Sequence, residues 1–168
     1  GAPSAAAEPP HKTVVVLSPF QVDLSSNLLA AQALREEFGK VTDLRLDVYF
    51  EYLDLNRFPD TAYQQQIFTL LTTKYKSRPI DLVIVGSEAM LKLWLVQRAE
   101  ILPDTPVVFF DVFTEHLNTL SLPADVTGVS GVEDCEKSVR WVLDALPAVD
   151  EIVLVGGVGK IEQGFFDH

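Results

Sequence analysis

Several residues in this sequence are of types that perform chemistry, but few have the spacing that a known reaction requires. Residues 156–160 (GGVGK) resemble a phosphate-binding loop, which needs a glycine five residues before its Gly-Lys pair and Ser or Thr after it. Leu154 and Ile161 occupy those two positions. We therefore expect a plain turn there rather than a nucleotide site.

The candidate nucleophiles and metal ligands also lack the neighbouring residues that catalysis or metal binding requires. Neither Ser87 nor Ser130 has glycines both two residues before and two residues after it, as a nucleophile elbow requires. His116 is not placed beside a serine, so we expect a surface or helix-capping role, and Cys135 falls on an apolar helix stripe as a core thiol. One cysteine cannot form an internal disulfide, and three scattered histidines do not make a standard zinc site. We predict no catalytic residue, no metal and no cofactor.

The composition is that of an acidic globular domain. The chain has 168 residues, of which 48% are hydrophobic, and a net charge of −11. No two Lys or Arg residues are adjacent, which argues against nucleic acid or an anionic membrane surface as a partner. No apolar stretch approaches the roughly 18 residues that cross a bilayer. Residues 1–12 are small and Pro-rich and are expected to form a flexible tether, either after a cleaved signal segment or as an ordinary terminus.

Apolar, β-branched runs alternate with helical patterns along the rest of the chain. The predicted strands are 13–17, 44–50, 80–85, 107–110, 126–130 and 152–155. The predicted helix starts are at Asp23 or Ser25, Asp60, Ser87 and Asp134. Leu28 and Leu70 are assigned to the apolar stripes of the first two helices. This alternation predicts an α/β three-layer sandwich, with helices on both faces of a parallel, flavodoxin-like sheet.

In such sheets, ligands bind beyond the carboxyl ends of the strands, near the point where the strand order reverses. The first of these loops, residues 18–21 (SPFQ), contains no glycine, so the dinucleotide fingerprint is absent. The loop also lacks the hydroxyl-rich turn of a flavin domain and the pair of acids of a receiver domain. The familiar enzymes and switches of this fold are therefore poorly supported.

An ordered set of residues after the second predicted strand is more specific. The set comprises 51–58 (EYLDLNRF), Tyr63, Lys74, Tyr75, 79–85 (PIDLVIV), Ala89, Leu91 and 106–110 (PVVFF). It resembles the ABC-transporter substrate-binding-protein-like domains that serve as extracytoplasmic sensors of bacterial histidine kinases. Those domains are similar to type I periplasmic binding proteins. The resemblance implies a two-lobed clamp, each lobe an α/β sandwich, that closes on a small ligand.

The resemblance also divides the chain. Residues 1–12 would be the tether and residues 13–131 the first ligand-binding lobe, which resembles one lobe of a type I periplasmic binding protein. Residues 132–168 would then be a crossover helix and the first strand of a truncated second lobe, or would pack back on the first lobe.

If the clamp is correct, the strand-end loops form the wall of its cleft. The expected ligand-binding residues are Ser18, Phe20, Gln21, Ser87, Glu88, Asp111, Phe113 and Ser130. Glu88 and Asp111 favour a ligand with an amino group or several hydroxyls over an anion. Structural alternatives stay open: Ser87 and Glu88 as a helix cap and first-turn acid, and Asp111 as a cap of the segment after it. Asp54 and Arg57, three residues apart, are expected to form a salt bridge.

The function that the resemblance implies is a non-enzymatic, periplasmic or otherwise extracytoplasmic sensor domain for a small molecule, signalling by lobe closure. Membrane contact would come only through a tether or transmembrane segment outside this chain, and a homodimer is compatible with this role. Three alternatives stay open: the substrate-binding component of an ABC transporter, a flavodoxin-like enzyme with an unrecognised site, and a non-binding dimerisation module.

Overall fold

The computed structural model describes residues 9–132, 134–153 and 155. The chain divides into two compact units, residues 1–132 and 133–168, where the sequence predicted a division after residue 131. Among the described helices, none is both long enough and apolar enough to span a bilayer. The candidate site lies in the first unit. Among the described residues of the second unit there is one helix, α5 (Cys135–Ala145).

The first unit is built on a single parallel sheet. Its strands are β1 (His11–Ser18), β2 (Arg45–Tyr52), β3 (Leu82–Gly86), β4 (Val107–Phe113) and β5 (Val126–Gly131). Its helices are α1 (Ser25–Phe38), α2 (Thr61–Tyr75), α3 (Glu88–Ile101) and the single turn α4 (Thr114–Leu117). The strand order is β2-β1-β3-β4-β5, and every neighbouring pair is parallel. The predicted α/β fold with a flavodoxin-like parallel sheet is confirmed.

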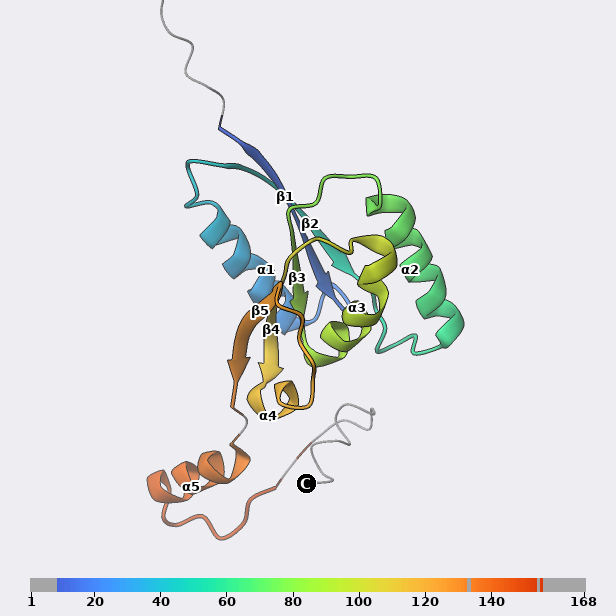
Figure 1. The fold of residues 1–168 in the computed structure, drawn as a ribbon. Helices are drawn as coiled ribbons and strands as arrows, with labels where there is room; N and C mark the ends of the chain where they lie inside the picture. The colour runs from blue at the N-terminus through green and yellow to red at the C-terminus, as the bar shows by residue number, and fades with distance from the viewer. Residues whose placement is uncertain (1–8, 133, 154, 156–168) are drawn as a thin grey trace, which may run out of the picture. The chain divides into compact units, whose positions relative to one another are not determined.

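Both faces of this sheet are buried, which explains why its central strands are continuous apolar runs. In β1, Val15 and Leu17 enter the larger core cluster, together with buried side chains of α2 and α3. Val14 and Val16 point the other way, into a smaller cluster with Leu34 of α1. Figure 1 shows the corresponding layers, with α1 on one side of the sheet and α2 and α3 on the other.

The four predicted helix starts are confirmed: α1 begins at Ser25, and Asp60, Ser87 and Asp134 directly precede α2, α3 and α5. Two of these residues also cap their helices. The Ser87 hydroxyl accepts the Met90 N–H at 3.4 Å, and the Asp134 carboxylate accepts the Lys137 N–H at 2.7 Å. Asp60 makes no capping hydrogen bond. The cap predicted for α1 at Asp23 or Ser25 is wrong, because Leu24 occupies the cap position and no side chain caps the helix.

Two leucines and one predicted strand also differ from expectation. Leu28 and Leu70 are 53% and 59% exposed, because Ala31 and Leu71 fill the buried faces of α1 and α2 instead. The strand predicted at 152–155 is wrong for its described residues, which have no regular structure. A strand forms only where a neighbour pairs with its backbone, and no such pairing involves these residues. Leu154, residues 156–160 and the Cys135 side chain lie outside what the structure describes.

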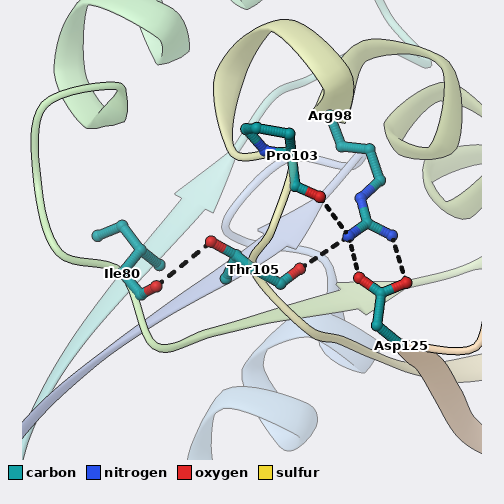
Figure 2. Close-up of polar contacts among 5 residues, drawn as sticks. All are labelled: Ile80, Arg98, Pro103, Thr105 and Asp125. Atoms are coloured by element: carbon teal, nitrogen blue, oxygen red, sulfur yellow. Dashed lines mark hydrogen bonds and ion pairs between the residues drawn. The ribbon is translucent and has the colours of Figure 1, made fainter.

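The amino edge of the sheet is braced by a buried arginine (Figure 2). Arg98, on α3, is 6% exposed. Its Nη2 donates to the carbonyl oxygens of Pro103 and Thr105, both at 3.0 Å, and it forms a two-pronged ion pair with Asp125. The Thr105 hydroxyl donates in turn to the Ile80 carbonyl at 3.3 Å. One side chain thus fixes the loops that lead into β4 and β5.

Candidate functional site

The strand order of the sheet reverses between β1 and β3. The chain leaves β1 toward β2 on one side, whereas β3, β4 and β5 follow on the other side, so the order reverses there. Loops diverge from the carboxyl edge at such a point and leave space for a ligand. The loop after β1 carries Ser18, Phe20 and Gln21, and the turn after β3 carries Ser87 and Glu88. The predicted residues therefore flank the reversal.

The loop after β1 is held by a residue that the sequence did not single out. The Ser18 hydroxyl donates to the Asn27 Oδ1 at 2.8 Å and accepts the Phe20 N–H at 3.3 Å. The Asn27 Nδ2 donates to the Gln21 carbonyl at 2.7 Å. Ser18 is buried and its hydroxyl is already used, so its role is to shape the loop. Asn27 could have been found, since it is a polar residue on the inward stripe of α1.

Gln21 carries a hydrogen-bond acceptor without a partner. Its side-chain Oε1 is buried, and no donor in the described part of the chain reaches it. A buried acceptor of this kind costs about 1–3 kcal/mol until something donates to it. A ligand bearing an N–H or O–H group would supply that bond, so Gln21 fits the predicted binding role.

Strained backbone marks the ends of three strands. Asp54 follows β2 with φ 54°, Ser87 follows β3 with φ 77° and ψ 153°, and Asp111 lies in β4 with φ 58°. These are the described non-glycine residues with positive φ, and Ser87 occupies a region that is almost exclusive to glycine. Strain of this kind is concentrated at binding and catalytic sites. The sequence gave no warning of it, because glycine is the usual marker.

Ser87 is locked in this turn from both sides. Its N–H donates to the Phe110 carbonyl at 3.1 Å, and its hydroxyl caps α3. Gly86 before it lets the Phe110 ring approach closely, because a Cβ there would lie 2.8 Å from the tip of that ring. The turn thus presents the first residues of α3 to the carboxyl edge.

Replacing Ser87 tests the strain directly. We expect Ser87→Gly to raise the free energy of unfolding by about 1 kcal/mol, because glycine relieves the strain and weakens the cap only slightly. Ser87→Ala should lower it by about 1 kcal/mol, because the strain stays and the cap is lost. Urea unfolding measures both, and Ser26→Gly in α1 is the control, where ordinary helical backbone predicts a loss. Two Ser87 variants with changes of the same sign would contradict the strain.

Glu88 is present at the edge, but its charge is balanced. Its carboxylate forms ion pairs with Lys92 on the same helix and with His116 on α4, the latter without hydrogen-bond geometry at Nδ1. The His116 ring meets Phe113 edge-on, with 5.9 Å between ring centroids. The sequence predicted a surface or helix-capping role for His116, and the structure places this partly exposed side chain against two predicted site residues. Glu88 serves as a first-turn acid and anchors α4.

Asp111 is a carboxylate at this edge for which no partner is seen among the described residues. It is exposed and sits in a β-bulge, where the pairing of β4 with β5 shifts register between Phe109 and Val112. Bulges redirect side chains and are common beside binding sites. Asp111 does not cap the following segment, because α4 has Phe113 at its cap position.

Ser130 lies on β5, beside the start of α4. The Thr114 hydroxyl oxygen lies 3.0 Å from both the Ser130 Oγ and the Gly131 carbonyl oxygen, and its single hydrogen is donated to one of them at a time. The predicted residues thus form one group around Ser18 and Gln21 and another around Ser87, Glu88 and Phe113. Ser130 is linked to the second group through α4 and through its pairing with Val112 of β4.

Most polar residues of the ordered set that carried the resemblance stabilise the fold. Asp54 and Arg57 form the expected salt bridge at 2.6 Å, and Tyr63 donates to the Leu53 carbonyl at 3.0 Å. Glu51 accepts from both Lys74 and Tyr75, which ties α2 to β2. Burial and the hydrogen bond to Glu51 raise the pKa of Tyr75. These contacts hold the loop after β2 in place.

Two hollows in the first unit lie away from this edge. One, of about 250 Å³, lies between the end of α1 and β2, and the other, of about 540 Å³, lies between the ends of α2 and α3. Comparisons with protein-family models, with curated proteins and with solved structures gave no match. The features of the carboxyl edge are therefore the basis of the function proposed below.

Proposed function

We propose that this chain is an extracytoplasmic ligand-binding domain of the type that senses a small molecule for a membrane histidine kinase. The observation that carries the proposal is the occurrence, at the carboxyl edge of one sheet, of strained backbone after β3 and in β4 together with an unpartnered buried acceptor in the loop after β1. Ser87 and Asp111 hold strained conformations there, and the Gln21 Oε1 is buried without a donor. A site built only for stability would relieve both features.

The chemistry of this edge favours a ligand that donates hydrogen bonds. Gln21 offers an acceptor oxygen, and Asp111 offers an exposed carboxylate without an ion pair among the described residues. Glu88 is already paired with Lys92 and lies against His116, so its carboxylate offers little free charge to a cationic ligand. We therefore propose an amine or a polyol as the ligand, with the half-buried Phe20 and Phe113 covering its apolar side.

Signalling would follow from closure of a clamp on this ligand. A ligand that contacts both walls of a cleft binds the closed state more tightly and shifts the population toward it. The open surface at the carboxyl edge supplies one wall in this proposal. A transmembrane helix and a kinase encoded after residue 168 would identify a sensor, whereas an ABC transporter component would be free of both.

A thermal-shift screen against amino acids, polyamines, sugars and nucleosides tests the proposal. A ligand at about 100 times its Kd should stabilise the fold by about 2.7 kcal/mol, a shift of several degrees. Asp111→Asn should abolish the shift for an amine and weaken it less for a polyol. Asp104→Asn, which removes a charge from an exposed loop at the opposite edge, is the matched control and should leave the shift unchanged.

Two outcomes would overturn the proposal. One is a ligand whose shift survives Asp111→Asn and Gln21→Leu together, because binding would then lie elsewhere. The other is the absence of any shift, both with this chain and with the longer protein that contains it. The second outcome would move the assignment to a non-binding dimerisation module.

A further inference from the structure

The loop of residues 18–21, which follows β1, is anchored on one side through its backbone. The Leu53 N–H donates to the Ser18 carbonyl at 2.9 Å. The Leu55 N–H donates to the Pro19 carbonyl at 2.6 Å. Both donors belong to the segment that follows β2, so main-chain atoms hold this side of the loop whatever the side chains are.

On its α1 side, the loop is held by the Asn27 side chain, which uses both ends of its amide. The Asn27 Oδ1 accepts the Ser18 hydroxyl at 2.8 Å, and the Nδ2 donates to the Gln21 carbonyl at 2.7 Å. The Ser18 hydroxyl accepts the Phe20 N–H at 3.3 Å in turn. An amide accepts at one end and donates at the other. One residue therefore fixes both the start and the end of the loop.

Gln21 is the loop residue whose position this arrangement determines. Its backbone carbonyl accepts the Leu24 N–H at 3.4 Å in addition to the Asn27 amide, so its backbone is fixed relative to α1. Its side-chain Oε1 is buried and has no donor in the described part of the chain. A side chain on a mobile backbone would turn such an acceptor toward water, because leaving it unpaired costs free energy. The fixed backbone keeps the acceptor at the carboxyl edge.

We propose that Asn27 is a positioning residue that makes this edge select ligands with a hydrogen-bond donor, so that a primary ammonium group is preferred to a quaternary one. The inference rests on the proposed ligand-binding function and narrows its ligand. Both ions carry the same charge for Asp111, but a quaternary ammonium has no N–H for the Gln21 Oε1. A site built around a polar group strongly rejects an analogue that leaves that group unpaired.

Nuclear magnetic resonance of the complete chain tests first whether Asn27 holds Gln21. The Gln21 side-chain amide should have an order parameter of about 0.8, and Asn27→Leu, which keeps the volume but removes the amide, should lower it below about 0.6. Ala31→Gly weakens α1 at a buried position without removing a loop hydrogen bond. This control should lower the melting temperature and leave the order parameter unchanged. An equally high order parameter in Asn27→Leu would overturn the inference.

Calorimetric titration with two probes of equal charge, putrescine and its bis(trimethylammonium) analogue, then tests the selection. The native chain should bind putrescine at least about tenfold more tightly than the analogue, and Asn27→Leu should reduce this ratio to about threefold or less. Gln21→Leu should remove the preference as well, because the acceptor is gone, whereas Ala31→Gly should keep it.

Equal binding of the two probes by the native chain, or binding of neither, would also overturn the inference. The proposed function has a separate test, because the thermal-shift screen shows whether any ligand depends on Asp111. A ligand that depends on Asp111 and binds Asn27→Leu as tightly as the native chain would leave the proposed function standing and remove the role of Asn27.

Discussion

Gly128→Ala is expected to lower the free energy of unfolding by about 3 kcal/mol and the melting temperature by about 10 °C. A Cβ at residue 128 would lie 2.2 Å from the Phe109 carbonyl oxygen and 2.5 Å from the Phe109 ring. Backbone cannot rotate away as a side chain can, so β5 would have to separate from β4. Exposure alone would not predict this loss of stability, because Gly128 is itself exposed.

The requirement for glycine arises from the bulge in β4. Phe109 pairs with Gly128, and the register then shifts before Val112 pairs with Ser130. Gly131→Ala is the matched control, since its Cβ would meet only the Phe113 ring at 3.9 Å, an ordinary contact. Calorimetry should show a change within about 0.5 kcal/mol for this control. Equal losses in the two variants would mean that the close approach at Phe109 does not constrain the strand.

Arg98→Met is expected to destabilise the first unit by about 3 kcal/mol. Methionine fills the same buried space but leaves the carbonyl oxygens of Pro103 and Thr105 without a donor. The loss of attraction to Asp125 contributes less, because that carboxylate is 40% exposed and water can replace the arginine. Urea unfolding should therefore show a larger loss for Arg98→Met than for Asp125→Asn.

Arg57→Met is the control for this variant. Arg57 also forms a two-pronged pair with an aspartate, Asp54, but its own side chain is 56% exposed. We expect its loss to stay below about 1 kcal/mol. A loss equal to that of Arg98→Met would show that the carbonyl contacts of Arg98 do not account for its effect.

The same arginine makes stability depend on pH. Hydrogen bonds from Arg98 lower the pKa of Asp125, and hydrogen bonds from Lys12 and from the Thr13 N–H lower the pKa of Asp81. A carboxyl whose pKa is lowered by folding stabilises the native state above its unfolded pKa of about 3.9. That contribution disappears as the pH falls through the folded pKa. The acid limb of the stability profile should therefore flatten in Asp125→Asn.

The order of strands and helices was readable from the sequence because burial leaves a periodic record. β1 is buried on both faces, so residues 14–17 form an unbroken apolar run. β2 is half-buried along most of its length at the edge, and apolar and polar residues alternate over 44–48. Ser87 and Asp134 were readable as caps because short polar side chains are preferred before a helix, but the same pattern at Asp60 gave no capping hydrogen bond. The salt bridge between Asp54 and Arg57 followed from spacing alone.

Other features depended on contacts between residues far apart in the chain. The exposure of Leu70 and the buried arginine at position 98 depend on which helix face meets the sheet, and a stripe defines that face only to within about one residue. His116 meets Glu88, which is 28 residues earlier, and nothing local encodes that approach. The strained backbone at Ser87 and Asp111 is likewise imposed by neighbouring strands.

The sequence by itself determined the α/β class and the alternation of strands and helices, and it predicted the edge of the sheet where we propose that a ligand binds. Those follow from short-range patterns of apolar and polar residues, which reflect burial one element at a time. Only the tertiary structure decided which polar groups at that edge are already satisfied and which are free, as Ser18 and Glu88 differ from Gln21 and Asp111. The physical reason is that hydrogen bonds and ion pairs are completed by partners from other elements, whose positions are fixed only when the sheet assembles.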